Sequence, residues 1–585
     1  MHSDEQVEGP SSEAGTKAEA QLDGQYTPED ACDVQAPEGV QKIEAFKVVW
    51  SKWSLIIAYT GIYALLVWIS LQQYSNYSLS AYVVSDFAAH SLVSTTSMVC
   101  FLIAGVVQVP IAKFLDLTGR MEGFILMVFF MELGLVMLTA CENVATYTAA
   151  MVFYEIGFSG IGYVITVFIV DTTQPKNRGW MLGAQNLPAL GTTFAGAPLA
   201  QAFLDHSTWR WAFGTFTIVI PFIAVPIILS LWANQRKSRK LGVVTRRPAS
   251  GRTTWQSIIH YGIEFDAIGV ALFGAGVTVF LLPFTLAASS YKSWGSGIEI
   301  TMFVVGGVLI IAFVVYEWFW SPKSFIAFSL LKDRNVLGAC IFNLATGMAY
   351  FVWESYYTSW LQVVAGLSIT HAGYVGSIYW NCVGLAGIVS GLVVRQTGDF
   401  KWVAFAGTCL MTLGVGLLIH FRKLGVDVGY IVMCQLFIGF GGGIITIAQY
   451  LALLAPSVGK KQNTQRSVAV LLSLSSLFSK IGAAIGLCIA GGIWTNEFLD
   501  SLTRRLPDTY KSQAEQIYGS LVYQLLALEN PLTKDAVLGA YDDMQRKLTI
   551  TATALYALAF VGLALWQDVK LEEVEGDEEK KGVVI

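Results

Sequence analysis

Long, uninterrupted blocks of apolar residues constrain this chain more than any other feature of its sequence. Each block is about 18–25 residues long, the length at which an α-helix crosses a bilayer. Only 14% of the 585 residues are charged, whereas roughly 25% are charged in ordinary soluble domains. The chain is therefore predicted to be an all-α polytopic membrane protein. About fourteen transmembrane helices are expected, near residues 53–74, 91–112, 123–141, 146–170, 180–203, 211–233, 266–286, 299–319, 337–360, 371–394, 402–421, 429–454, 466–494 and 548–566.

The orientation of these helices follows from the basic residues of the loops. The central loop, residues 234–265, carries several arginines and lysines, whereas the 72–90 loop has none. Cytoplasmic loops carry an excess of Lys and Arg, so the central loop is predicted to be cytoplasmic and the 72–90 loop external. An even number of spans then places both termini in the cytoplasm. The 72–90 loop also contains a glycosylation sequon at Asn76, whose use the sequence leaves open.

A charged stretch follows the second apolar block. It reads KFLDLTGR and places Asp116, Gly119 and Arg120 on a predicted cytoplasmic turn. Asp and Arg side chains at such a turn can pair with helix ends, separating and re-forming as two halves of a transporter rock. A related stretch, GLVVRQTGDFK at residues 391–401, follows the tenth block, where a repeat of the first half would place it. The first stretch resembles the motif between spans two and three of major facilitator transporters, with Ala112 in place of the family's leading glycine.

This resemblance implies the major facilitator fold, with two six-helix bundles and, for fourteen spans, two extra central helices. It divides the chain into a disordered acidic tail (1–45), an N-terminal six-helix bundle (46–233), a basic cytoplasmic loop (234–265), two extra transmembrane helices (266–336), a C-terminal six-helix bundle (337–566) that includes a large external loop (495–547), and an acidic cytoplasmic tail (567–585). Within the external loop, helical spacing of Ile517, Leu521 and Leu525 predicts a short amphipathic helix.

Further stretches resemble the fungal siderophore–iron transporter family. They are HSLVST from His90, VDTTQPKNRG with Asp171 and Arg178, APLAQAFL from Ala197, WRWAFG from Trp209, LLPFTLA from Leu281, LLKDRNV from Leu330, SYYTSWLQVV from Ser355 and SKIGAAIGLCIAGGIWTNEF from Ser479. The resemblance implies import of ferric siderophores in symport with protons, and a gating role for Asp171 and Arg178 beside Asp116, Gly119 and Arg120. It further implies a monomer without cofactors in the lipid bilayer, in the plasma membrane or in a vacuolar or endosomal membrane.

Ionisable residues inside membrane spans are candidates for function, because their burial is costly. Glu155 and Glu354 lie in spans of opposite halves and are predicted to carry the coupled proton; structural hydrogen bonds remain the alternative. Lys480 precedes a G-x-x-x-G pair, Gly482 and Gly486, whose small residues favour close helix packing. We expect Lys480 to face the central cavity and to pair with a carboxylate such as Glu354 or to attract an anionic part of the chelate. Snorkelling toward the cytoplasm is the alternative.

Polar and aromatic side chains inside the spans predict the substrate site. On the ninth span, Asn343, Tyr350 and Tyr357 share one side of the helix with Glu354. Rings and hydroxyl groups of this kind suit a bulky polar ligand. The full predicted set is Tyr59, Tyr63, Gln185, Asn186, Asn343, Tyr350, Trp353, Tyr357, Gln449, Tyr450 and Lys480. For each of these residues, helix packing or an interfacial position remains the alternative.

The sequence lacks the motifs of other function classes. No phosphate-binding glycine loop, nucleophile elbow or metal-ligand spacing is visible, so neither an enzyme nor a resident metal is expected, and nucleic acid is not an expected partner. A proton-coupled exporter of drugs or glutathione on the same fold remains the alternative function. The fourth span reads VFYEIGFSGIG and lacks the arginine that many such exporters carry there, which favours import.

Overall fold

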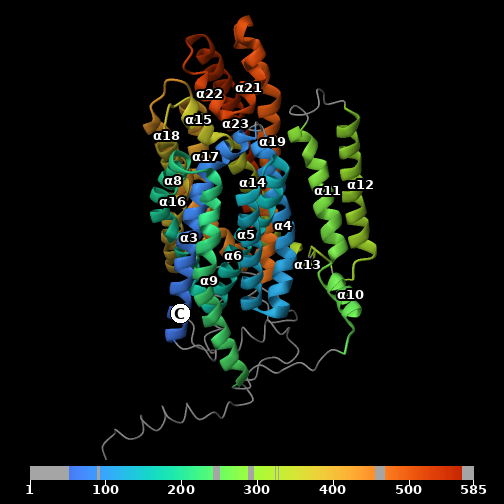
Figure 1. Cartoon of the computed structure of the whole chain (residues 1–585). Helices are drawn as coiled ribbons and strands as arrows, with labels where there is room; N and C mark the ends of the chain where they lie inside the picture. Colours follow the sequence, from blue (N-terminus) through green and yellow to red (C-terminus); the bar gives the residue numbers. More distant parts are fainter. Residues whose placement is uncertain are drawn as a thin grey trace, which may run out of the picture.

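The computed structural model describes residues 52–87, 92–240, 251–286, 296–322, 324–326, 328–454 and 468–568, and these residues form helices without a strand. Thirteen of the helices are long and apolar enough to cross a membrane. They stand roughly parallel to one another in Figure 1. The prediction of an all-α polytopic membrane protein is confirmed. The predicted disordered N-terminal tail and nearly all of the acidic C-terminal tail lie outside the described residues.

Seven helices make up the N-terminal half. They are α3 (Lys52–Asp86), α4 (Val93–Thr118), α5 (Arg120–Ala140), α6 (Val144–Thr172), α7 (Pro175–Ala184), α8 (Leu187–His206) and α9 (Trp209–Lys240). Helix α3 continues through most of the predicted 72–90 loop, so Asn76 of the sequon lies within a helix.

The fifth predicted span is the one that is not among the thirteen membrane-spanning candidates. It is divided into α7 and α8 at Gln185 and Asn186, and Pro188 is the second residue of α8. A proline in this position has no N–H to donate and does not continue the preceding helix. The break places two amide side chains, Gln185 and Asn186, inside the bundle.

The central segment forms a separate hairpin. Its helices are α10 (Thr254–Glu264), α11 (Ala267–Leu286), α12 (Gly297–Phe319) and the short α13 (Phe328–Leu331). Figure 1 shows α11 and α12 side by side next to the main bundle, with α10 beneath α11. Helix α11 packs on α4 and α19, where a small apolar cluster contains Met98, Leu102, Leu281 and Leu487.

The C-terminal half begins after α13. Its membrane helices and the segments between them are α14 (Arg334–Glu354), α15 (Tyr357–Val363), α16 (Ile369–Thr397), α17 (Phe400–Phe421), α18 (Val428–Leu454), α19 (Val468–Ile493), η4 (Trp494–Phe498), α20 (Leu499–Arg505), η5 (Asp508–Gln513), α21 (Ala514–Gly519), α22 (Leu521–Leu526) and α23 (Pro531–Ala564). Buried side chains of both halves belong to one continuous hydrophobic core.

The segment predicted as the loop 495–547 is largely helical. The predicted amphipathic helix is divided into α21 and α22 at Ser520, and the last long helix already begins at Pro531. Asn530 is the N-cap residue of this helix and accepts a hydrogen bond from the Leu532 amide.

We call residues 494–530 the cap and the end of the bundle that carries them the capped end. The opposite end carries Arg236, Lys237, Arg239 and Lys240 of α9 and is called the basic end.

Two main contacts join the halves: α7 and α8 pack against α16, and α4 packs against α19. Glycines bring the backbones of α7 and α16 together in the first contact. A Cβ on Gly183 would lie 2.7 Å from the carbonyl carbon of Gly387, and a Cβ on Gly391 would lie 2.5 Å from that of Gly179. We call these four glycines the glycine seam. They allow a closer approach of two membrane helices than any side chain would permit.

Candidate functional site

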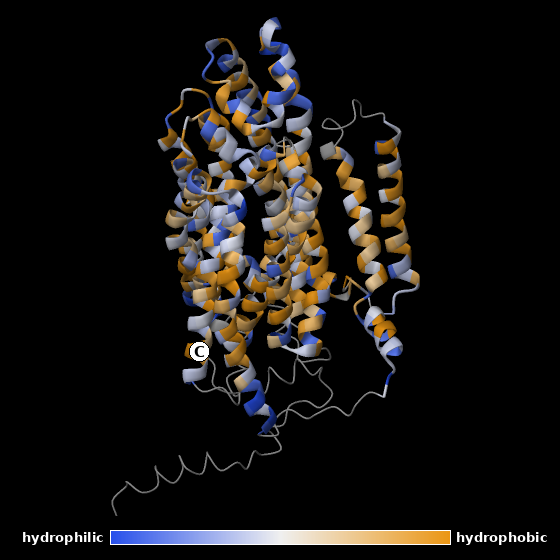
Figure 2. Cartoon of the chain, in the orientation of Figure 1, coloured by the Kyte–Doolittle hydropathy of each residue, from blue (hydrophilic) through white to orange (hydrophobic). Residues whose placement is uncertain are grey.

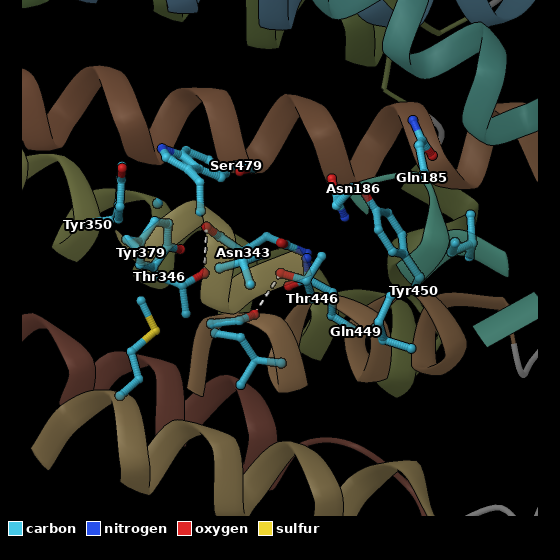
Figure 3. Close-up of a pocket in the computed structure, with 18 of the residues that line it drawn as sticks. Gln185, Asn186, Asn343, Thr346, Tyr350, Tyr379, Thr446, Gln449, Tyr450 and Ser479 are labelled. Atoms are coloured by element: carbon cyan, nitrogen blue, oxygen red, sulfur yellow. Dashed lines mark hydrogen bonds between the residues drawn. The ribbon is translucent and has the colours of Figure 1, made fainter. Parts of the chain in front are cut away.

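Two adjoining chambers lie between the halves. One has a volume of about 350 Å³ and the other about 280 Å³. Both lie within or near the size range of small-molecule sites. The side chains that line both are Thr166, Gln185, Asn343, Gln449, Tyr450 and Ser479. They come from α6, the α7–α8 break, α14, α18 and α19, so the chambers are built from both halves; Figure 3 shows the larger one.

Most of the residues predicted to bind substrate line these chambers. They are Gln185, Asn186, Asn343, Tyr350, Gln449, Tyr450 and Lys480. Asn343 is held in place by two hydrogen bonds of 2.9 Å, which its amide nitrogen donates to the Ala339 carbonyl and to Ser475 Oγ. The α7–α8 break brings Gln185 toward Thr166 Oγ1, which donates to the Gln185 amide oxygen at 3.1 Å. The lining therefore presents amide, hydroxyl and ring groups around the void.

The sequence analysis missed several lining residues. Among them are Thr346, Tyr379, Thr446 and Ser479, which Figure 3 shows around the same void. A signal for two of them was present, since Thr346 follows Asn343 by one helical turn and Ser479 directly precedes Lys480. Tyr379 packs on Tyr350 with ring centroids 4.8 Å apart. Its place depends on how α16 packs on α14, which spacing along one helix does not predict.

Four predicted substrate-binding residues line neither chamber. Tyr59 is buried within the N-terminal half, where its hydroxyl lies 2.8 Å from Thr172 Oγ1, and Tyr63 follows it one turn later on α3. Trp353 and Tyr357 are buried among aromatic rings of the C-terminal half. The polar face expected on α14 therefore divides. Asn343 and Tyr350 reach the void, whereas Tyr357 lies in the core, because α14 ends at Glu354 and the left-handed Tyr356 separates it from α15.

Glu155 and Lys480 form an ion pair across the two halves. The Lys480 ammonium lies 2.5 Å from Glu155 Oε1, and both side chains are largely buried. Glu155 belongs to α6 and Lys480 to α19, so the pair links the bundles at the wall of the smaller chamber. We expected Glu354 as an example of a carboxylate partner for Lys480. The structure pairs Lys480 with Glu155 instead, because Glu354 is the last residue of α14, at the capped end, and lines neither chamber.

Lys480 is accommodated by an aromatic ring and a glycine of α4. Its ammonium lies 4.3 Å from the centroid of the Phe101 ring, a cation–π contact. A Cβ on Gly105 would lie only 2.6 Å from Lys480 Cβ, so α4 leaves room for the lysine stem. Gly482 and Gly486 face α14: a Cβ on them would lie 2.1 and 2.4 Å from the carbonyl oxygens of Leu344 and Met348. The close packing predicted from G-x-x-x-G is confirmed.

Glu354 has different neighbours. Its carboxyl group lies close to the hydroxyl of Tyr77 of α3 and near Arg422. Arg422, which follows α17, is only 2% exposed; it donates to the Trp353 carbonyl at 2.6 Å and lies over the rings of Tyr357 and Trp360. Arg422 was not among the predicted site residues. It directly follows a predicted span, and a charged residue in that position is usually exposed in a loop.

Further polar contacts join the halves at the capped end. Tyr82 donates to the amide oxygen of Gln362 at 2.5 Å, and Ser94 donates to the Tyr356 hydroxyl at 3.0 Å. The Leu521 amide of the cap donates to Ser85 Oγ of α3 at 3.2 Å. Tyr356 has a left-handed backbone with φ of 58°, and its ring stacks on Trp494 of η4 with centroids 4.0 Å apart.

The halves are also joined toward the basic end, where the Tyr163 hydroxyl of α6 donates to the Ala469 carbonyl of α19.

Comparison with known proteins decides the family. The model of the Major Facilitator Superfamily matches residues 53–487. The chain is 41% identical to MFS siderochrome iron transporter 1 of Ajellomyces capsulatus, over 95% of this chain and 93% of that protein. The chain belongs to the fungal siderophore iron transporter family of the Major Facilitator Superfamily. The resemblance expected from the sequence motifs is thereby confirmed.

Other members of this transporter family are similarly related. The chain is 39% identical to siderophore iron transporter mirB of Emericella nidulans over 93% of this chain and 89% of that protein. It is 40% identical to MFS siderochrome iron transporter D of Aspergillus fumigatus over 92% and 89%. Among solved structures, a bacterial homolog of the human lysosomal transporter Spinster matches with a TM-score of 0.53 and 13% identity, over 88% of this chain and 98% of that one. That likeness supports the fold alone.

The charged motif of this major facilitator transporter forms a compact cluster near the basic end. Arg120 Nε lies 2.9 Å from Asp171, and its Nη1 lies 3.3 Å from Asp116. Gly119, between α4 and α5, has φ of 120°, a backbone conformation that favours glycine. Asp116, Arg120 and Asp171 all belong to the N-terminal half, so this cluster ties α4, α5 and α6 together. Arg178 lies in α7.

The described residues offer no candidate site for a resident metal. No group of three or more His, Cys, Asp or Glu side chains that could hold an ion occurs among the residues that were described. The seven cysteines in this part of the chain are free thiols.

Proposed function

We propose that this transporter imports ferric siderophores. The observation that carries the proposal is the polar, aromatic cavity between the halves of a chain whose relatives are named siderophore iron transporters. A siderophore surrounds its iron with its own oxygen atoms, so the iron travels as cargo within the chelate. The protein then needs hydrogen-bonding groups for the chelate's amide and hydroxamate oxygens. Gln449 and Tyr450 offer donors of this kind at the chambers, and the Asn343 amide oxygen can accept from N–H groups of the chelate.

The proposed energy source is a proton gradient that acts through Glu155. While Glu155 is ionised, its pairing with Lys480 favours the arrangement in which α6 and α19 lie together. Protonation would neutralise the carboxylate and weaken the link between the halves, and the halves could then separate along this contact. Glu354, which lies close to Tyr77 of the opposite half, offers a second proton site at the capped end. Alternation between the two arrangements would expose the chambers first to one side and then to the other.

Gating and orientation complete the proposal. The cluster of Asp116, Arg120 and Asp171, the Gly119 turn and Arg178 would control access at the basic end, which we assign to the cytoplasm with both termini. The contacts of Tyr82, Ser94 and the cap would close the external end. We further propose that the protein works as a monomer in the plasma membrane.

Uptake of radiolabelled iron tests this function. The chain would be expressed in a yeast strain that lacks its own siderophore uptake systems and supplied with a panel of hydroxamate and catecholate chelates. We expect accumulation of one or more chelates, and loss of accumulation when an uncoupler collapses the proton gradient. Transport of no chelate, together with proton-dependent efflux of drugs or glutathione, would replace this proposal by the exporter function.

A further inference from the structure

Helix α10 has a strongly divided surface. It begins at a capping box, in which Thr253 Oγ1 accepts from the Gln256 amide and the Gln256 side chain accepts from the Thr253 amide. None of its residues is buried. Four exposed apolar side chains gather along one face, Trp255, Ile258, Ile259 and Ile263, while the exposed Tyr261 lies outside this face. The opposite face carries Gln256, Ser257, His260 and Glu264. Figure 2 shows this alternation of apolar and polar residues on α10.

The structure fixes where this helix ends. Asp266 has φ of 50° and turns the chain from α10 into α11. Its carboxylate accepts hydrogen bonds from the amides of Gly269 at 3.2 Å and Phe325 at 2.9 Å. From α4, the Lys113 ammonium reaches the Glu264 carbonyl at 3.5 Å. The C-terminal end of α10 is therefore tied to α4, to the start of α11 and to the chain that follows α12.

The C-terminal end of α10 lies at the same end of the hairpin as the last residues of α12. Helix α12 runs antiparallel to α11 and ends in three aromatic residues, Trp318, Phe319 and Trp320, which are 70–82% exposed. Large aromatic side chains on the outside of membrane proteins are enriched where the bilayer meets water. Ser321 next to them donates to Asp266, so α10 leaves the hairpin at the level of this aromatic group. Figure 1 shows α10 directly beneath α11 at this end.

Positively charged residues near α10 also favour a position at the membrane surface. Arg252 precedes α10 and is exposed, and the basic end also carries the exposed Arg236, Lys237, Arg239 and Lys240 of α9. An amphipathic helix with an apolar face and nearby cations binds in the plane of a membrane whose headgroups are anionic. We propose that α10 lies in the membrane interface at the basic end, with its apolar face among the acyl chains and Arg252 among anionic headgroups. The surface is thus a lipid-binding anchor for the α11–α12 hairpin, separate from the transport chambers.

The test compares the two faces of α10 in the full-length protein. Cys32 and the exposed Cys409 are first replaced by serine, since the other cysteines are buried. Ile258→Cys and its neighbour Ser257→Cys, which lies on the polar face, are then labelled with an environment-sensitive fluorophore. Each protein is reconstituted into phosphatidylcholine vesicles with and without phosphatidylserine. We expect the probe at residue 258 to be several-fold brighter, to be quenched by lipids that carry a shallow nitroxide, and to resist aqueous iodide.

The matched probe at residue 257 should show the reverse pattern, and phosphatidylserine should enlarge the difference between the two positions. Equal quenching of both probes by iodide would overturn the proposal, because α10 would then lie in water. Protection of residue 258 without nitroxide quenching would also overturn it, because a protein surface would then cover the apolar face. Both readouts are independent of transport, so they remain interpretable if the chain moves another substrate.

Discussion

Lys480 of α19 and Glu155 of α6 form an ion pair of 2.5 Å between residues that are 325 positions apart in the chain. The pair answers why a lysine occurs in an otherwise apolar span. Its charge is balanced by a carboxylate, and its ammonium also contacts the face of the Phe101 ring. Since the two helices belong to different halves, any change in the charge of either residue acts on the contact between the halves.

Glu155→Gln tests whether this pair couples transport to protons. The amide keeps the size of the carboxylate but neither takes up a proton nor bears a charge. We expect chelate accumulation driven by a pH gradient in proteoliposomes to be lost, whereas exchange of labelled for unlabelled chelate without a gradient persists. Gradient-driven accumulation at the rate of the unchanged protein would remove Glu155 from the coupling step.

Lys480→Met tests how much stability is lost when the Glu155 carboxylate has no positively charged partner. Removing one partner of a buried ion pair costs about 3–5 kcal/mol, because the remaining charge is unpaired. The thermal unfolding temperature of the purified protein should therefore fall. The double variant Lys480→Met with Glu155→Gln should recover most of the loss, because no unpaired charge remains. Equal unfolding temperatures for the single and double variants would contradict a direct pairing.

Gly486→Ala tests the packing of α19 on α14. The added methyl group would lie 2.4 Å from the Met348 carbonyl oxygen, which is backbone and has little freedom to move. Overpacking of this kind costs about 1–3 kcal/mol, so a lower unfolding temperature is expected. Gly307→Ala in α12 is the matched control, since nothing lies within 4 Å of its added Cβ. A similar change in both variants would argue against close helix contact at Gly486.

Tyr356→Phe tests the link between halves at the capped end. The variant loses the 3.0 Å hydrogen bond from Ser94 and keeps the ring that stacks on Trp494. A hydrogen bond contributes about 1 kcal/mol net, which corresponds to about a fivefold shift toward the open capped end. Spin labels at Thr208 and Leu424 would report the population of longer distances by electron spin resonance. Tyr523→Phe on the exposed surface of the cap serves as the control and should leave the distances unchanged.

Gln449→Ala and Tyr63→Phe separate residues at the cavity from predicted residues elsewhere. Gln449 lines both chambers, whereas Tyr63 lines neither. Loss of one hydrogen bond to the chelate, about 1 kcal/mol, should raise the KM of uptake about fivefold for Gln449→Ala. Tyr63→Phe should leave it unchanged. The opposite order of effects would place the chelate near α3 and outside the chambers.

Much of the architecture followed from the sequence because a bilayer imposes simple rules on helices. Block length and hydropathy predicted the thirteen membrane-spanning candidates, whereas the fifth expected span is divided at Gln185 and Asn186 and is not among them. The same break explains why those two amides reach the chambers. Helical spacing brought Asn343 and Tyr350 onto one face of α14, and both line the larger chamber.

Spacing along one helix does not determine which neighbouring helix a residue faces. Tyr59 and Tyr63 share a face of α3, yet Tyr59 contacts Thr172 within its own half. For the same reason the partner of Lys480 could not be derived, since Glu155 and Glu354 are both carboxylates inside spans. The helical content of the cap was underestimated because each of its helices is short, so the helical spacing of apolar residues repeats only once or twice in each.

The glycine seam between α7 and α16 has a consequence for how this protein can vary. A side chain added at Gly183 would meet the backbone of Gly387, and one added at Gly391 would meet the backbone of Gly179. In most cores a larger residue is tolerated once a smaller one appears opposite. Here the opposing residue is already glycine, so no compensating replacement exists. Revertant screens starting from Gly183→Val should therefore return the original residue or a distant change that separates α7 from α16, and never a substitution at Gly387.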